Sequence, residues 1–263
     1  MAFIFGAFVS AIMTLCLMIW LSESVDFLLM RRPDKALERI NKLLCRMRLE
    51  TIESLPEKAA KTGTVGGIRM LLSKAYLPQS ALMWISIFTV FTGFYFITSW
   101  TPKLLVDAGW TLQQAIFANV VINIGGSLSG FGFGYLSVRA GYRWAVRSVL
   151  FLTLLSFVLF GMFGDVLSLR FVLPLFLGFF LFGTLVSQYI LLPRLYETAI
   201  RSTGTGWALG IGRLGAVAAP FVAGQMLAAG WEGFDLYFIY AGAYVISLTA
   251  VSTIWALAAR EPQ

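Results

Sequence analysis

The chain has 263 residues, of which 59% are hydrophobic and only 13% are charged, and its formal net charge is +7. Soluble domains carry about 45–50% apolar and about 25% charged residues. The composition therefore indicates a polytopic membrane protein and excludes a disordered chain, a secreted disulfide scaffold and a cytosolic enzyme. The absence of histidine excludes a histidine-ligated metal site, a histidine-based catalytic triad and a histidine proton relay. No disulfide between Cys16 and Cys45 is expected, because only Cys16 lies in an apolar stretch.

Seven segments have the length and apolar character that a membrane-spanning helix needs, about 20 residues. In chain order they are Ala2–Trp20, Ser80–Thr101, Ala115–Leu136, Ala145–Phe163, Phe171–Leu192, Thr205–Leu227 and Leu236–Ala258. The first segment has no basic start and no small-residue cleavage site after it, so we interpret it as a spanning helix and not as a signal peptide. The sequence thus predicts an all-α polytopic bundle.

The lysines and arginines predict the orientation of these segments in the membrane. Seventeen of them lie after the first segment, in the third-to-fourth and fifth-to-sixth connections, and in the C-terminal tail. The alternate connections hold only Lys103 and Arg170, and Arg213 lies inside a segment. By the positive-inside rule, the C-terminus is expected to lie in the cytoplasm. The protein is expected in the cell (inner) membrane. This distribution explains the positive charge without a nucleic-acid partner.

Residues 21–79 form a long basic connection that is predicted to contain one amphipathic helix. Pro33-Asp34 is a helix-start signal. Apolar residues then recur at helical spacing opposite charged ones: Leu37, Ile40, Leu44 and Met47 against Lys35, Glu38, Lys42 and Arg46. A calmodulin-like target and a lipid-binding switch are alternatives, but we favour a helix that tethers two bundles.

Four strings in this arrangement resemble a known family. They are residues 21–28 (LSESVDFL), 31–37 (RRPDKAL), 94–105 (FYFITSWTPKLL) and 195–215 (LYETAIRSTGTGWALGIGRLG). They are similar to motifs of the major facilitator superfamily, and most like those of its aromatic acid:proton symporter branch. The resemblance covers essentially the whole chain. It implies that residues 1–20 are the last helix of an otherwise absent N-terminal half, 21–79 the cytoplasmic central loop, and 80–263 the six-helix C-terminal bundle.

The resemblance also implies a function. We expect secondary transport of a small organic anion, such as the aromatic carboxylate hydroxybenzoate, in symport with protons and without a cofactor. The alternatives are a porter for sugars or other organic ions, a non-transporting membrane half-subunit or truncated product, and, last, a membrane enzyme. No intramembrane cluster of acidic residues or cysteines supports the enzyme, so none is expected.

The family closes its inner face with charge pairs and helix-end contacts at turns. The matching residues here are Arg139, Arg143, Arg201, Gly134 and Gly141, which are therefore the expected gating residues. Two positions depart from the family pattern: Val138 stands where an aspartate is usual, and Ala199 where a glutamate is usual, with Glu197 in the place of a proline. Both changes remove an acid from among basic residues, so a weaker charge-paired latch is expected.

Arg213 is the one ionisable residue deep in an apolar segment. A charge near the bilayer centre costs about 2.5–3.5 kcal/mol on insertion scales, so it normally faces a cavity or a partner. Gly206 and Gly210 share its helical face, and a guanidinium matches a carboxylate bidentately. A substrate carboxylate clamp and a structural pair with a neighbouring helix are both consistent with the residues, and the resemblance favours the clamp.

Further candidate substrate-binding residues are Asn119, Asn123, Gln188, Tyr95 and Trp100. For the two asparagines the more probable alternative is packing between helices, beside a predicted stripe of Gly126, Gly130 and Gly134. Trp100 defaults to the aromatic belt at the membrane interface. Pro220 predicts a bend that suits either gating or packing.

The chain is not expected to transport alone. A six-helix half supplies one wall of a central cavity, whereas alternating access needs two halves. The acids that the resemblance places in the family's first helix lie outside this sequence. We therefore expect a truncated or split gene product that works in the lipid bilayer with an N-terminal half or with a second copy of itself.

Overall fold

The computed structural model describes residues 2–20, 28–29, 32–33, 35–47, 49–52, 54–55, 64–164, 166, 169, 171–197 and 200–259. The chain divides into two compact units, Met1–Lys61 and Thr62–Gln263, and each is described by itself. Within the described residues the elements are helical and none is a strand. The sequence prediction of an all-α protein is therefore confirmed.

The first unit contains α1 (Ala2–Trp20) and α3 (Ala36–Arg46). Helix α3 occupies the segment for which an amphipathic helix is predicted. It buries Ile40 and exposes the charged side chains of the opposite face. Asn41, within α3, forms two side-chain hydrogen bonds with the backbone of Ile52, which lies after the helix; each is 2.9 Å long. These bonds hold the segment around Ile52 against the helix.

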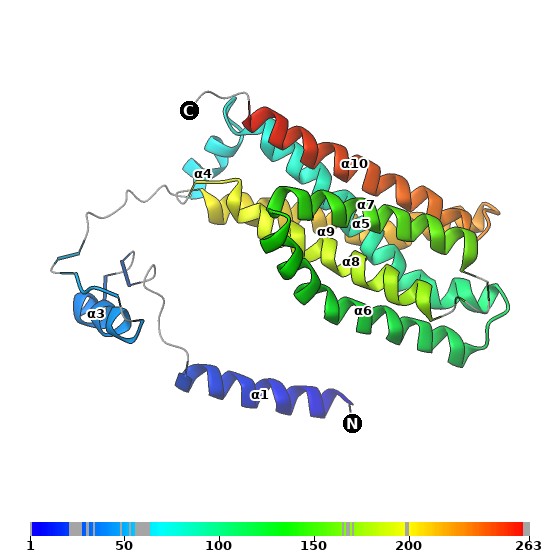
Figure 1. Cartoon of the computed structure of the whole chain (residues 1–263), viewed down its shortest axis with the longest axis horizontal. Coiled ribbons are helices and arrows are strands. Elements are labelled where there is room, and N and C mark those ends of the chain that lie inside the picture. The colour runs from blue at the N-terminus through cyan, green and yellow to red at the C-terminus, as the bar shows by residue number, and fades with distance from the viewer. Residues whose placement is uncertain are drawn as a thin grey trace. The chain divides into compact units, whose positions relative to one another are not determined.

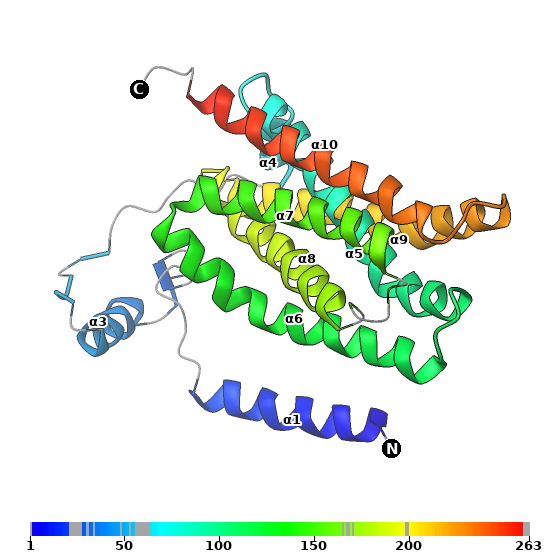
Figure 2. The same cartoon turned by 45° about the vertical axis from the view of Figure 1, so that its right-hand side comes forward.

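The second unit is a bundle of long helices that run roughly along one direction (Figures 1 and 2). Its elements are α4 (Thr64–Leu71), α5 (Leu77–Asp107), α6 (Leu112–Arg139), α7 (Tyr142–Phe163), α8 (Val172–Leu191), the 3₁₀ turn η2 (Leu192–Arg194), α9 (Arg201–Ala228) and α10 (Asp235–Ala258). Among the described residues, six helices are long and apolar enough to cross a membrane, namely α5 to α10. The apolar run of α1, Gly6–Met18, is shorter, so a spanning role for α1 stays a prediction.

The helices extend beyond the apolar segments from which they were predicted. Helix α5 continues through Pro102 to Asp107, and α6 starts three residues before its apolar run. Thr111 caps α6: its hydroxyl accepts from the Gln114 backbone N–H, and the Gln114 side chain accepts from the Thr111 N–H. Such caps satisfy the backbone donors that a helix start leaves free. Hydropathy detects the apolar run and not these ends.

The packing order shows two related sets of three helices. Helix α5 packs against α9 and α10, while α8 packs against α6 and α7, and α7 also packs against α10. Exchanging α5 with α8, α6 with α9 and α7 with α10 reproduces these pairings. Because each set crosses three times, the second set begins on the opposite side from the first. This is the arrangement of inverted three-helix repeats.

Glycines allow two of these helix pairs to meet backbone to backbone. A side-chain carbon on Gly178 of α8 would collide with the carbonyl of Ile122 on α6, and one on Gly215 of α9 would collide with the carbonyl of Phe88 on α5. Lipid offers no hydrophobic drive for helix association, so close contact of this kind is a main source of stability. The two contacts fix α6 on α8 and α9 on α5.

Buried aromatic rings fill the space between α5, α7 and α10. Tyr237 and Tyr244 are fully buried, and Phe96 stacks on Tyr240 with ring centroids 4.1 Å apart. The hydroxyls of Thr101 and Tyr237 lie 3.0 Å apart, so the buried phenol keeps a hydrogen bond. The core therefore satisfies this polar atom inside the bundle, as burial in apolar surroundings requires.

The glycine contact predicts the effect of adding one methyl group. Gly178→Ala should lower the free energy of unfolding by about 1–3 kcal/mol, because the α6 backbone has to move to make room. The matched control is Gly130→Ala, where an added carbon meets no atom within 4 Å. Thermal unfolding in detergent, followed by size-exclusion chromatography, measures both variants. Equal melting temperatures for the two would contradict the close contact.

Candidate functional site

Arg213 lies near the middle of α9 on the exposed face of that helix. Its Nη1 donates a hydrogen bond of 2.9 Å to the Tyr95 hydroxyl on α5. Its guanidinium carbon also lies 5.7 Å from the centre of the Phe91 ring, a cation–π distance. No ion pair of Arg213 with an acid occurs among the residues that the structure describes. Its contacts there are aromatic and leave most of its donors free.

The position of Arg213 follows from the residues beside it. Gly212 and Gly215 are buried, and a carbon added to Gly212 would lie 3.4 Å from the Phe91 ring. These two glycines bring α9 against α5, so the Arg213 side chain emerges beside Phe91 and Tyr95. On the exposed face, Gly206 and Gly210 have nothing within 4 Å of an added carbon. Space is therefore open along the exposed face of α9 on which Arg213 lies.

Four side chains from three helices form what we call the Arg213 cluster: Arg213, Phe91, Tyr95 and Tyr189. Phe91 is its buried centre, with ring centroids 6.1 Å from Tyr95 and 6.3 Å from Tyr189 of α8. Tyr189 meets Phe91 nearly at a right angle, 67°, and is 43% exposed. Phe91 was not selected from the sequence, although its spacing four residues before Tyr95 places the two on one helix face.

Asn119 and Asn123 lie on α6 and do not bond to a neighbouring helix within the described part of the chain. The Asn123 side chain is exposed and donates to the Asn119 backbone carbonyl, 2.8 Å away. Packing of α6 on α8 uses other positions. Gly126 contacts Phe182, but Gly130 and Gly134 are exposed with open space around them. The predicted packing stripe is therefore wrong beyond Gly126, and the asparagines are not interhelical contacts there.

Gln188 and Trp100 point to partners other than Arg213. Gln188 is fully buried, with Ser86 Oγ 3.4 Å from its Oε1, and its Nε2 has no hydrogen-bond partner in the described structure. The Trp100 indole donates to the carbonyl of Pro220, 3.1 Å away. Tyr240 donates to the preceding carbonyl, that of Ala219, at 2.7 Å. Side chains of α5 and α10 thus hold the turn of α9 that contains its proline.

One end of the second unit carries most of its positive charge, and we call it the arginine end. It comprises α4, the starts of α5, α7 and α9, and the ends of α6, α8 and α10, with these described basic residues: Arg69, Lys74, Arg139, Arg143, Arg147, Arg194 and Arg201. None of them forms an ion pair with a described acid.

Aromatic rings hold several of these arginines instead. Arg194 lies 4.3 Å from the centre of the Tyr142 ring, Arg147 lies 4.9 Å from that of Trp255, and Arg139 lies 5.0 Å from that of Tyr135. Of the expected gating residues, Arg143 is exposed and Arg201 Nε donates a long bond of 3.4 Å to the Tyr196 carbonyl. Gly141 starts α7 with a positive φ of 81°. Of the expected gating arginines, Arg139 therefore has a cation–π contact, and Arg143 and Arg201 have none among the described residues.

A second set of contacts at the arginine end joins α5 to the chain before α9. The Tyr76 hydroxyl donates to Glu197 Oε1 at 2.7 Å, and Gln79 donates to the Leu195 carbonyl at 2.6 Å. The buried Tyr196 hydroxyl donates to Ser80, and burial raises the pKa of Tyr196 more than this hydrogen bond lowers it. Glu197, which stands where the family has proline, is thus an acceptor. Ala199 lies outside the described residues.

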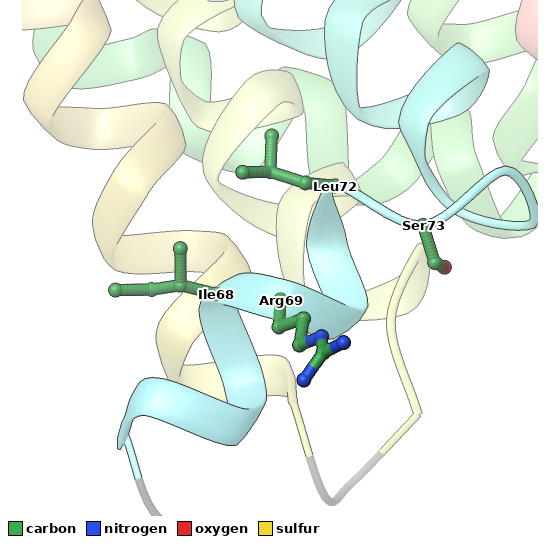
Figure 3. A pocket seen from close by; sticks show the side chains of 4 residues that line it. All are labelled: Ile68, Arg69, Leu72 and Ser73. Carbon is green, nitrogen blue, oxygen red and sulfur yellow. The ribbon is translucent and has the colours of Figure 1, made fainter.

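One hollow of the described surface lies on α4 and the turn after it, and not at the Arg213 cluster. Figure 3 shows its lining residues, Ile68, Arg69, Leu72 and Ser73, and its volume is about 610 Å³. All four come from one short helix and the turn after it, and only Arg69 and Ser73 are polar. Ligand sites bring polar groups together from several elements. By that criterion the Arg213 cluster, with side chains from α5, α8 and α9, is the better candidate.

Comparisons with known proteins agree with this geometry. A family model described as "Major Facilitator Superfamily" matches residues 1–220. The 4-hydroxybenzoate transporter PcaK of Acinetobacter baylyi is 29% identical over 239 residues, covering 88% of this chain and 51% of that protein. The niacin transporter NiaP of the same organism is 28% identical, covering 92% of this chain and 54% of NiaP. The benzoate transport protein of Acinetobacter baylyi is 26% identical, covering 82% of this chain and 47% of that protein.

The chain thus spans about half the length of the curated relatives that it matches. These relatives are named as transporters, which supports the exclusion of an enzyme. The family match covers more than half of this chain, and α5 to α10 form the six-helix half that such a family fold contains. The chain is a multi-pass membrane protein that belongs to the Major Facilitator Superfamily.

Proposed function

We propose that the chain is the C-terminal part of a proton-coupled transporter for a small aromatic carboxylate such as hydroxybenzoate. The observation that carries the proposal is an arginine in the middle of a spanning helix whose contacts among the described residues are a tyrosine hydroxyl and an aromatic ring. A guanidinium has five N–H donors, and only one is used by Tyr95. The remaining donors suit a carboxylate, and the neighbouring rings suit an aromatic group. The names of the relatives point to the same substrate class.

Asn119, Asn123, Gln188 and Trp100 take different places in this proposal. The asparagines lie on a helix face that is open in this unit, so they remain candidates for contact with substrate. Trp100 acts on the bend of α9 and Gln188 inside the bundle, and their support for binding is indirect. Tyr95 and Arg213 are the residues that the geometry favours most.

Transport requires a second half. Helices α5 to α10 form one bundle, while alternating access needs two bundles that rock about a shared site. An exposed Arg213 facing lipid would be costly, by about 2.5–3.5 kcal/mol on insertion scales, unless protein or a water-filled cavity covers it. We therefore propose that an N-terminal half, or less favourably a second copy of this chain, covers the Arg213 face. Residues 1–20 and 21–79 would be the last helix of that half and the connecting loop.

We also propose that the arginine end faces the cytoplasm of a cell (inner) membrane and contains the inner gate. Its basic residues outnumber those of the other end of the unit, where Lys103 is paired with Asp107. Arg139, Arg143, Arg201, Gly134 and Gly141 lie at the turns of this end. Pro220 lies on α9 on the far side of Arg213 from the arginine end, where a bend would move the part of α9 that contains the gate and the site relative to the rest of the helix.

The carboxylate site predicts how changes at Arg213 alter uptake. In a transporter completed with an N-terminal half, Arg213→Ala should abolish uptake of 4-hydroxybenzoate, and Arg213→Lys should retain the charge but weaken uptake by losing bidentate geometry. Uptake of labelled substrate into proteoliposomes under an imposed proton gradient measures both effects. Lys103→Gln serves as the control for loss of a charge away from the site. Normal uptake by the alanine variant would show that Arg213 is structural.

The orientation predicts which residues a membrane-impermeant thiol reagent reaches. In a Cys16→Ser background, Cys45 should react only after the cell membrane is permeabilised, because residues 21–79 are proposed to be cytoplasmic. Both cysteines are free and exposed, so the label has access once it enters. Labelling of Cys45 in intact cells would place this segment outside and reverse the orientation.

The proposed inner gate predicts that an acidic residue at position 138 stabilises the closed inner face. Val138 is exposed beside Arg139, so Val138→Asp should add a charge pair worth about 0.2–1 kcal/mol and favour the closed inner face. Reactivity of a reporter cysteine placed at the arginine end should then fall. The isosteric, uncharged Val138→Thr is the control, and equal or higher reactivity in the aspartate variant would refute the latch.

A further inference from the structure

We propose that Tyr189 makes the site selective for aromatic acids by contacting the substrate ring, while Tyr95 positions Arg213. This inference rests on the proposed function, since it assigns separate tasks to the two tyrosines of the Arg213 cluster. Arg213 alone would accept any carboxylate. Discrimination between aromatic and aliphatic acids therefore needs a second group that responds to the ring.

Phe91 connects the charge to Tyr189. It contacts the Arg213 guanidinium, Tyr95 and Tyr189, but it is only 2% exposed and its surface is already covered. Tyr189 belongs to the same cluster and keeps 43% of its surface exposed. Tyr95 and Tyr189 both contact the buried Phe91, and Tyr189 is the more exposed of the two. The Arg213 guanidinium carbon lies 5.7 Å and the Tyr189 ring centroid 6.3 Å from the centre of the Phe91 ring, so we infer that a substrate whose carboxylate binds Arg213 places its ring against Tyr189.

The hydroxyl of Tyr189 adds a second reason. It has no hydrogen-bond partner among the described residues, unlike the hydroxyls of Tyr95, Tyr196 and Tyr240, which are engaged. A tyrosine that contributed only to packing would be expected to bury its ring and bond its hydroxyl. Tyr189 buries its ring only in part, against the edge contact to Phe91, and its hydroxyl has no partner among the described residues. This combination is typical of a residue oriented toward a partner outside the bundle.

Tyr95 has a different task because its hydroxyl is already the acceptor for Arg213 Nη1. That bond fixes one edge of the guanidinium and leaves its other donors free for a carboxylate. Loss of the bond would let the long Arg213 side chain move and would weaken binding of every carboxylate. Loss of the Tyr189 ring would weaken binding of aromatic acids alone. The two variants therefore differ in selectivity as well as in affinity.

The test measures equilibrium binding to the chain and not transport, so it does not require alternating access. Saturation-transfer difference NMR on the purified chain in lipid nanodiscs gives the Kd of benzoate and of cyclohexanecarboxylate, which has the same carboxylate on a saturated ring. Aromatic pairs contribute about 0.5–1.5 kcal/mol beyond burial, so Tyr189→Leu should raise the benzoate Kd about 2- to 12-fold. The Kd of cyclohexanecarboxylate should stay within about twofold, since leucine still offers it an apolar surface.

Two variants separate ring contact from a general loss of structure. Tyr189→Phe keeps the ring and should retain the preference for benzoate. Phe176→Leu removes another exposed ring from the same helix α8, outside the Arg213 cluster, and should leave both Kd values unchanged. Tyr95→Phe should raise both Kd values by a similar factor, and Arg213→Ala should abolish binding of both acids.

The outcomes distinguish this inference from the proposed function. If Arg213→Ala abolishes binding but Tyr189→Leu leaves the ratio of the two Kd values unchanged, the selectivity role of Tyr189 is refuted and the carboxylate site stands. If benzoate fails to bind the unmodified chain, or binds it regardless of Arg213, the proposed site is refuted and the inference with it. A benzoate-specific loss in Tyr189→Leu that Tyr189→Phe reverses is the result that supports it.

Discussion

Contact between helix backbones at glycine is the constraint on which the rest of the second unit depends. Water does not drive helices together inside a membrane, so their association depends on how closely they approach. Gly178 brings α8 against Ile122 of α6, and Gly215 brings α9 against Phe88 of α5. The second contact lies two residues from Arg213. The same close approach that stabilises the bundle therefore also delivers the guanidinium to Phe91 and Tyr95.

The part of α9 that follows Arg213 contains a proline, Pro220. Pro220 removes a backbone donor, and the turn around it is supported from outside by Trp100 and Tyr240, which donate to two successive carbonyls. The carbonyl that loses its helical donor is that of Ala216, four residues before the proline, so the two bonds support the following turn and do not replace the missing one. Helices α5 and α10 thus grip α9 at a point where its own backbone is weakest, two turns from the charged residue that defines the candidate site.

The sequence was a good guide to the helices and to Arg213, since apolar length and an isolated charge are properties of a single segment. It failed where the result depended on which side of a helix faces a neighbour. Gly126, Gly130 and Gly134 recur every four residues, but an α-helix turns about 100° per residue, so such a stripe drifts by about 40° at each step. It starts on the buried face at Gly126 and leaves it by Gly130.

Neighbours in sequence differ for the same reason. Gln188 and Tyr189 are adjacent on α8, yet Gln188 is fully buried and Tyr189 is 43% exposed. The role of Phe91 was likewise hidden, because a buried phenylalanine in an apolar helix is indistinguishable by sequence from any other core residue. Only the crossing of α9 over α5 gives it an arginine as a neighbour.

The aromatic partners of the arginines have a consequence for the pH dependence of the contacts at the arginine end. A carboxylate that latches an arginine loses its charge as the pH falls through its pKa, so a latch of acids weakens in acidic surroundings. A cation–π contact needs no ionised carboxylate, and Arg139, Arg194 and Arg147 contact the rings of Tyr135, Tyr142 and Trp255. These three contacts of the arginine end therefore do not depend on the protonation of a carboxylate, and a response to pH has to come from other groups.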